Sequence, residues 1–158
     1  MKKRICAVIS VLVVLITLSA MAETEAPISD TGYSLTLPDT FTYQAPGNED
    51  YDNDLTAIYL SDDTEIEIFS YPVKDIDWQE LLAEMKKAAS DAGMTKVNGL
   101  DMLWYTTADP ADGATCVGYM LPAGEKLVEI DFWVGTQKAM DATPALLESI
   151  HRSKESET

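Results

Sequence analysis

The stretch from Asp75 to Gly93 constrains the fold more than any other part of the chain. Apolar side chains recur there at spacings of three and four residues, which places them along one stripe of a helix with the charged side chains opposite. The stripe consists of Trp78, Leu81, Leu82, Met85, Ala88, Ala89 and Ala92. Asp77 suits the N-cap position and Gly93 suits the left-handed residue that ends a helix. We therefore predict a helix from Asp77 to Ala92.

Most of the remaining chain alternates between apolar and polar residues, as half-buried strands do. Residues typical of turns separate these segments, and Asn98-Gly99 is the pair that best fits a two-residue hairpin turn. The short connections imply strands that run antiparallel to their neighbours along the chain. We predict strands at 32–38, 55–60, 65–71, 95–97, 100–107, 114–121 and 126–134.

A second helix is predicted near the C-terminus. Thr143 and Pro144 suit its cap and first position, and His151 would complement the negative charge at its end. The predicted fold class is therefore α+β, with one antiparallel sheet of about five to seven strands. The long helix covers one face of this sheet, and the C-terminal helix lies elsewhere. The predicted organisation is a flexible lead-in at 23–30, a single domain at 31–152 and a tail at 153–158.

Residues 1–22 have the features of a secretory signal peptide. Basic residues at positions 2–4 precede an apolar run that ends in Ala-Met-Ala at 20–22, a small-x-small cleavage pattern. The run is shorter than the roughly 20 apolar residues that a membrane-spanning helix needs, and no cysteine follows it for lipid attachment. We expect cleavage after Ala22, no membrane insertion of the cleaved protein, and a secreted or extracytoplasmic location.

Cleavage would leave a strongly acidic chain. Of the 11 basic residues, 8 would remain beside all 27 acidic ones, which changes the formal net charge from −16 to −19. The remaining basic residues are scattered, whereas phosphate binding needs them clustered, so we expect no nucleic-acid partner. An unidentified protein or a cationic small ligand is the expected partner. Cys116 would be the one remaining cysteine and His151 is the one histidine, so we expect no disulfide, no zinc site and no cofactor.

Several short segments resemble small PsbP-like domains, a family of α/β/α sandwiches that includes uncharacterised exported bacterial proteins. These segments are Gly32-Tyr33 followed by Leu35-x-Leu37-Pro38, the mid-chain helix, Asn98-Gly99-Leu100 and the ending Leu146-Leu147-Glu148-Ser149-Ile150. The resemblance implies an antiparallel sheet layered with helices. It implies no functional residue, because fold does not fix function.

Alternation within two predicted strands places acidic and aromatic side chains on a common side. These residues are Glu65, Glu67, Phe69, Tyr71, Glu129, Asp131 and Trp133. The apolar residues between them should face the long helix; they are Ile66, Ile68, Val128, Ile130, Phe132 and Val134. If the two strands are neighbours, the outer sheet face is acidic and aromatic, which suits cationic or amphipathic partners. We predict a non-enzymatic, exported binding or accessory domain that contacts its ligand through this face.

Two alternatives stay open. Carboxylates two residues apart on a strand lie about 7 Å from each other, a separation compatible with glycoside hydrolysis. The chain could therefore be a small extracytoplasmic hydrolase that uses carboxylates, and a deep pocket joining two acids with raised pKa values would favour that function.

The second alternative is a calcium-stabilised structural domain. Asp50, Asp52 and Asp54 have the spacing of the first three ligands in a calcium loop. The pattern then departs from that loop, since Leu55 stands in place of its glycine and Ser61 in place of its bidentate glutamate.

Overall fold

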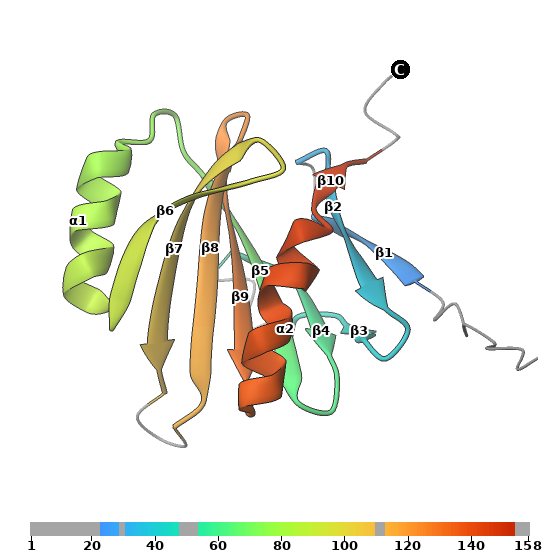
Figure 1. Cartoon of the computed structure of the whole chain (residues 1–158). Helices are drawn as coiled ribbons and strands as arrows, with labels where there is room; N and C mark the ends of the chain where they lie inside the picture. The colour runs from blue at the N-terminus through green and yellow to red at the C-terminus, as the bar shows by residue number, and fades with distance from the viewer. Residues whose placement is uncertain (1–22, 29–30, 48–53, 110–112, 154–158) are drawn as a thin grey trace, which may run out of the picture.

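The structure is a computed structural model that describes residues 23–28, 31–47, 54–109 and 113–153. Its elements form stacked layers, in which helices and a small sheet cover a larger sheet (Figure 1). In chain order the elements are β1 (Glu23–Ile28), β2 (Tyr33–Pro38), β3 (Thr42–Gln44), β4 (Leu55–Leu60), β5 (Thr64–Pro72), α1 (Trp78–Ala88), β6 (Asp91–Val97), β7 (Leu100–Ala108), β8 (Thr115–Ala123), β9 (Lys126–Val134), α2 (Gln137–Glu148) and β10 (His151–Arg152).

The larger sheet has seven antiparallel strands in the order β3-β4-β5-β9-β8-β7-β6. The predicted hairpin of β4 and β5 and the predicted meander from β6 to β9 are both present. The meander returns to the hairpin because β9 pairs with β5 along its whole length. At the β6–β7 turn, Asn98 (φ 50°) and Gly99 (φ 81°) both take left-handed conformations, as a tight hairpin turn requires.

A second sheet, which the sequence did not predict, joins the first and last segments that the structure describes. It has three strands in the order β1-β2-β10. Residues 23–30 were expected to be a flexible lead-in, but Glu23–Ile28 pairs with β2 and buries Ala26 and Ile28. That expectation is wrong because these two side chains fill space above the larger sheet. His151 lies in β10 rather than at a helix end, with its Nε2 3.4 Å from Oε1 of Glu25.

Helix α1 begins as predicted and ends earlier. The Asp77 carboxylate accepts hydrogen bonds from the backbone N–H groups of Gln79 and Glu80, at 3.0 and 3.1 Å. The helix stops at Ala88, however, and the chain continues into strand β6.

Gly93, predicted to end the helix, instead lies in β6 opposite Trp104 of β7. A Cβ atom at position 93 would lie 2.8 Å from Nε1 of Trp104, so glycine is needed there for close packing of the indole ring. The predicted helix boundary at Ala92 is therefore wrong, because Gly93 packs against Trp104 of the neighbouring strand.

Helix α2 begins at Gln137, six residues before the predicted cap at Thr143. Thr136 is the N-cap, and its hydroxyl accepts a hydrogen bond from the backbone N–H of Ala139 at 3.1 Å. Pro144 lies inside the helix, and the helix ends at Glu148. Of the helices in the described chain, neither is long and apolar enough to cross a membrane.

The two faces of the larger sheet are covered by different elements. We call one the aliphatic face; it carries Ile66, Ile68, Val128, Ile130, Phe132 and Val134, all buried. These side chains cluster with residues of the small sheet and α2, namely Ala26, Ile28, Leu35, Leu37, Ala139 and Leu147. Figure 1 shows α2 crossing in front of the middle strands and α1 beside β6 at one edge.

The prediction that the aliphatic face packs against the long helix is therefore wrong. The apolar stripe of α1 packs against the opposite face, beside Leu103, Tyr105 and Met120. The connection from α1 to β6 is short, which keeps the helix next to β6.

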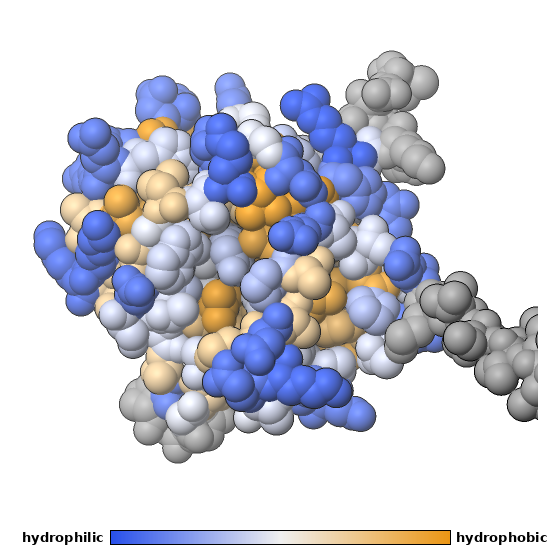
Figure 2. All heavy atoms as spheres, viewed as in Figure 1, coloured by the Kyte–Doolittle hydropathy of each residue, from blue (hydrophilic) through white to orange (hydrophobic). Residues whose placement is uncertain are grey.

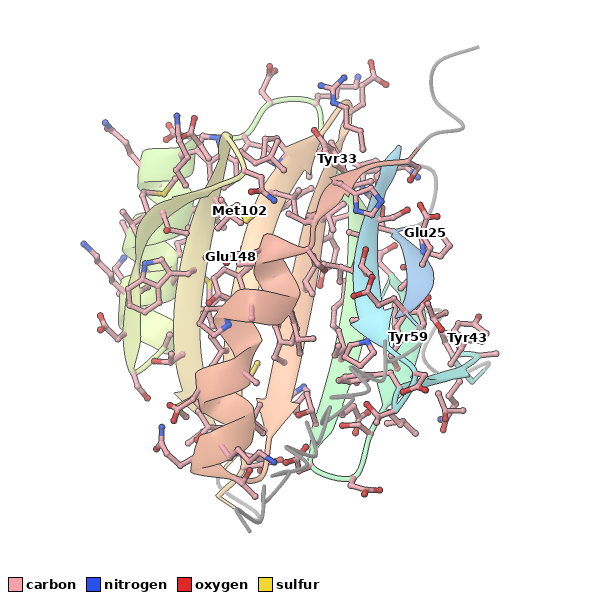
Figure 3. All side chains as sticks on the ribbon, turned by 45° about the vertical axis from the view of Figure 1, so that its right-hand side comes forward. Glu25, Tyr33, Tyr43, Tyr59, Met102 and Glu148 are labelled. Atoms are coloured by element: carbon pink, nitrogen blue, oxygen red, sulfur yellow. The ribbon has the colours of Figure 1, made fainter. Side chains whose placement is uncertain are left out.

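On the side of the molecule seen in Figure 1, apolar surface is divided into small patches surrounded by polar residues (Figure 2). At the other edge of the sheet Tyr43 is 56% exposed, and its ring centroid lies 5.5 Å from that of Tyr59 (Figure 3).

Candidate functional site

The strand register places all seven predicted contact residues on one face of the larger sheet. Glu65 lies opposite Trp133, Glu67 opposite Asp131, and Phe69 opposite Glu129. The two strands are neighbours, which is the condition on which the predicted acidic face depended. We call this side the acidic face, defined by Glu65, Glu67, Phe69, Tyr71, Glu129, Asp131 and Trp133.

Exposure divides these residues into two groups. Five are half-buried: Glu65, Glu67, Phe69, Tyr71 and Trp133. Glu129 and Asp131 are only 9% and 8% exposed, so these two carboxyls lie inside the protein and do not form part of an open contact surface. Alternation identified their side of the strand, but their burial depends on side chains from other strands.

Tyrosine hydroxyls hold the two buried carboxyls in place. The Tyr105 hydroxyl lies 2.5 Å from Oε1 of Glu129 and 2.7 Å from Oδ1 of Asp131. The Tyr71 hydroxyl donates to Oε2 of Glu129 at 2.8 Å. The Tyr71 ring stacks on Phe69 with 6.2 Å between centroids and 2° between ring planes. The buried acids are thus hydrogen-bonded, as buried polar groups must be.

Gly118 provides the space for this network. A Cβ atom there would lie 2.2 Å from the Tyr105 ring and 2.6 Å from Oδ1 of Asp131. Sequence reasoning missed both Tyr105 and Gly118. Alternation within the predicted strands could have placed both on this face once the pairing of β7, β8 and β9 was known.

The environment changes the acid–base properties of the network. Burial, together with the charge of Glu129, raises the pKa of Asp131 to about 7, although the hydrogen bond from Tyr105 acts in the opposite direction. Burial and the neighbouring acids also raise the pKa values of Tyr105 and Tyr71, so both phenols keep their protons at neutral pH. Cys116 is buried, and burial beside Asp131 raises the pKa of its thiol.

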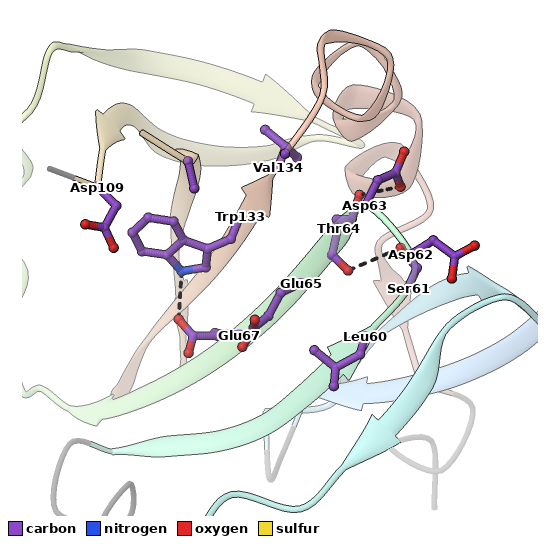
Figure 4. A pocket seen from close by; sticks show the side chains of 12 residues that line it. Leu60, Ser61, Asp62, Asp63, Thr64, Glu65, Glu67, Asp109, Trp133 and Val134 are labelled. Atoms are coloured by element: carbon purple, nitrogen blue, oxygen red, sulfur yellow. Dashed lines mark hydrogen bonds between the residues drawn. The ribbon is translucent and has the colours of Figure 1, made fainter. Parts of the chain in front are cut away.

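A hollow of about 500 Å³ opens beside the network, at the end of the sheet where β5 begins and β9 ends. Glu65, Glu67, Asp109 and Trp133 line it, together with the β4–β5 turn at 61–63. The indole N–H of Trp133 donates to Oε2 of Glu67 at 2.8 Å. Figure 4 shows Asp109 beside the six-membered ring of the indole and Glu67 at its N–H group. The hollow therefore combines carboxylates with an aromatic ring in a fixed position.

The predicted calcium ligands are only partly described. Asp50 and Asp52 lie outside the described residues, and Asp54 precedes β4 with a φ of 60°. Within the described chain, no group of three or more acidic, histidine or cysteine side chains is arranged to hold a metal ion. Calcium binding at this loop stays a prediction.

No protein-family model matches the chain, and no curated protein matches its sequence. Solved structures do match. Cyanobacterial PsbP (CyanoP) from Synechocystis sp. PCC 6803 is 8% identical with a TM-score of 0.61, over 86% of this chain and 95% of that one. LpqN, described as involved in cell envelope biogenesis of Mycobacterium tuberculosis, is 15% identical with a TM-score of 0.52, over 84% of this chain and 91% of that one.

A third match is a crystal structure from Bacteroides thetaiotaomicron VPI-5482, which is 13% identical with a TM-score of 0.60. The match covers 86% of this chain and 51% of that one. At identities this low, a structural match shows a shared fold only, and it carries no information about activity. The sequence resemblance and these structures agree: the protein has the α+β fold of the PsbP-like proteins.

Proposed function

We propose that the protein is an exported, non-enzymatic binding domain that holds a cationic group of a small ligand or a partner protein in the hollow on its acidic face. One observation carries this proposal: Glu65, Glu67 and Asp109 line the same hollow as Trp133. Carboxylates attract a cation, and the face of an indole ring attracts it as well. A neutral ligand would gain neither contribution.

The size and charge of the molecule support this proposal. The hollow, at about 500 Å³, falls within the range of roughly 300 to 1,000 Å³ that is usual for small-ligand sites. A formal net charge of −16 raises the local concentration of cations and repels nucleic acid. The hydrogen bond between Trp133 and Glu67 positions both groups before a ligand arrives, which reduces the entropy lost on binding.

Binding is favoured over hydrolysis by the position of the acids. Carboxylate catalysis needs an acid and a base that both reach the substrate. Asp131, whose pKa is raised to about 7, is not among the residues that line the hollow. Export is supported by the signal-like pattern of residues 1–22 and by the involvement of the structurally similar LpqN in cell envelope biogenesis.

Calorimetric titration with a matched pair of probes tests the proposal. N-acetyl-arginine amide carries one positive charge, and N-acetyl-citrulline amide is its uncharged analogue of nearly the same shape. We expect the arginine probe to bind more tightly, and Glu65→Gln together with Glu67→Gln to weaken it about tenfold or more.

Glu80→Gln together with Glu84→Gln is the control for this titration, because it makes the same change of charge at two exposed positions on α1, away from the hollow. It should leave the affinity unchanged. Equal affinities for the arginine and citrulline probes, or an unchanged affinity in the double variant, would contradict the proposal.

A further inference from the structure

The Tyr105 hydroxyl makes two short contacts with carboxyl oxygens but carries only one proton. It lies 2.5 Å from Oε1 of Glu129 and 2.7 Å from Oδ1 of Asp131. If it donates its proton to one carboxylate, the other contact joins two oxygens with no hydrogen between them unless that carboxyl is itself protonated. A protonated carboxyl would donate to the phenol oxygen and satisfy both contacts.

The surroundings of the pair contain further groups that disfavour two ionised carboxylates. The titratable groups that face it are Glu67 and Tyr71 from β5, Tyr105 from β7 and Cys116 from β8, with Asp54 near Tyr71 at the start of β4. These groups are acids, phenols and a thiol. Helix α1 contributes apolar side chains to this face: Trp78, Leu81, Leu82 and Met85. The negative charges are thus compensated by hydrogen bonds from neutral donors.

We infer that Glu129, Tyr105 and Asp131 retain one shared carboxyl proton at neutral pH, and that its release as the pH rises adds a negative charge directly behind the ligand hollow. The raised pKa of Asp131, about 7, agrees with this assignment. The second part of the inference rests on the proposed function, because it concerns the affinity of the hollow for a cation.

The strand register provides the connection between the buried pair and the hollow. Asp131 lies directly opposite Glu67 on the neighbouring strand, and Glu67 lines the hollow and accepts the Trp133 hydrogen bond. Side chains in such a cross-strand pair are close enough to interact strongly. A charge that forms on Asp131 therefore attracts a cation bound at Glu67, and binding of the cation lowers the pKa of Asp131 by the same free energy.

The same proton makes folding depend on pH in a defined direction. The pKa of Asp131 is raised in the folded protein from an ordinary value of 3.8 to about 7, so between these pH values the folded state binds more protons than the unfolded state. The stability from this group is complete below about pH 4 and is lost as the pH rises through about 7. In Asp131→Asn this loss is removed, so the urea midpoint of the variant should fall less than that of the wild type between these pH values.

Carbon-13 NMR of labelled side-chain carboxyls tests the retained proton without any ligand. We expect one carboxyl resonance to titrate near pH 7 and to be absent in Asp131→Asn. Tyr105→Phe should raise this midpoint, because the phenol hydrogen bond favours the ionised carboxyl. Tyr119→Phe is the control, since Tyr119 lies on the other face of the sheet and should leave the midpoint unchanged.

If Asp131→Asn does not fold, a change of the titration midpoint in Tyr105→Phe still assigns the resonance to the carboxyl beside Tyr105. The inference is wrong if every labelled carboxyl titrates below about pH 5, where ordinary carboxyls do.

Calorimetry with N-acetyl-arginine amide tests the coupling. We expect about fivefold tighter binding at about pH 8.5 than at about pH 6 in the wild type, and equal affinities at both in Asp131→Asn. Binding with the same affinity at both pH values would overturn the coupling and leave the proposed function intact. Absence of binding at either pH would overturn the proposed function together with the coupling, while the NMR titration decides separately whether the proton is retained.

Discussion

The two faces of the seven-stranded sheet are closed in different ways. On the aliphatic face, α2 and the small sheet bury a continuous group of apolar side chains. On the acidic face, α1 packs over the β6–β7 part of the sheet, and the remainder carries half-buried acids and aromatic rings above a buried carboxyl network. Apolar burial stabilises the fold directly, whereas buried acids contribute little net stability and instead fix a geometry. We therefore expect the aliphatic face to supply most of the stability and the acidic face to supply the site.

The comparison is tested most strongly by truncating one phenylalanine on each face. Phe132 is fully buried on the aliphatic face, and Phe69 is half-buried on the acidic face. Phe132→Ala should lower the free energy of unfolding by about 3 to 5 kcal/mol, because it removes a large side chain from a closed core. Phe69→Ala should lower it by about 1 kcal/mol. Urea denaturation measures both, and equal losses would show that the two faces contribute alike.

A substitution beneath the buried network tests how tightly the acidic face is packed. Gly118→Ala places a methyl group against the Tyr105 ring and should lower the free energy of unfolding by about 2 kcal/mol. Gly135→Ala is the matched control, because the nearest atom to a Cβ there is the Asp63 carbonyl oxygen, at 3.9 Å. Its stability should stay within about 0.5 kcal/mol of the wild type. If Gly118→Ala destabilises the protein no more than Gly135→Ala does in thermal unfolding, Tyr105 does not occupy the space above position 118.

The smallest effect is expected at the cap of α1. Asp77→Ala removes the acceptor for two backbone N–H groups and should cost about 1 kcal/mol, with faster amide hydrogen exchange confined to the first turn of the helix. Asp75→Ala removes an exposed acid two residues earlier and should have little effect. Faster exchange throughout the sheet in Asp77→Ala would mean that α1 holds the acidic face together more than its edge position indicates.

Local patterns predicted those features of the fold that depend on neighbouring residues. Strand β9 has the predicted bounds, Lys126 to Val134, because alternation and the turn before it are both local signals. The predicted end of α1 was wrong because Gly93 lies in β6, packed against Trp104 from the next strand. The helical stripe continues through Ala92 in sequence, and only tertiary packing interrupts it.

The sequence did not predict which helix covers which face of the larger sheet. Alternation shows which side chains share a face, but it does not show which helix covers that face. Both sides of the central strands carry apolar residues, such as Leu127 and Met120 beside the acids, so the stripe of α1 could pack on either side. Strand β1 was missed because its burial of Ala26 depends on a second sheet that closes only when β10 joins β2.

The sequence predicted only those site residues whose position depends on alternation within a strand. The positions of Glu65 and Glu67 beside Trp133 followed from alternation once the strands were neighbours. Asp109 follows β7 and reaches the hollow from a turn, so the strand pattern did not include it. The burial of Glu129 required Tyr71 and Tyr105 from two other strands.

The side chain of Asn98 has a consequence for the order in which the chain assembles. Its Nδ2 donates to the carbonyl oxygens of Glu148 at 2.7 Å and Ile150 at 3.0 Å, which lie 50 and 52 positions further along. A hairpin turn forms from residues that are adjacent in sequence. The side-chain amide of Asn98 can therefore be in place before α2 has formed. Glu148 and Ile150, which are synthesised later than Asn98, then meet donors that are already oriented, and this favours a folding sequence in which the meander precedes the docking of α2.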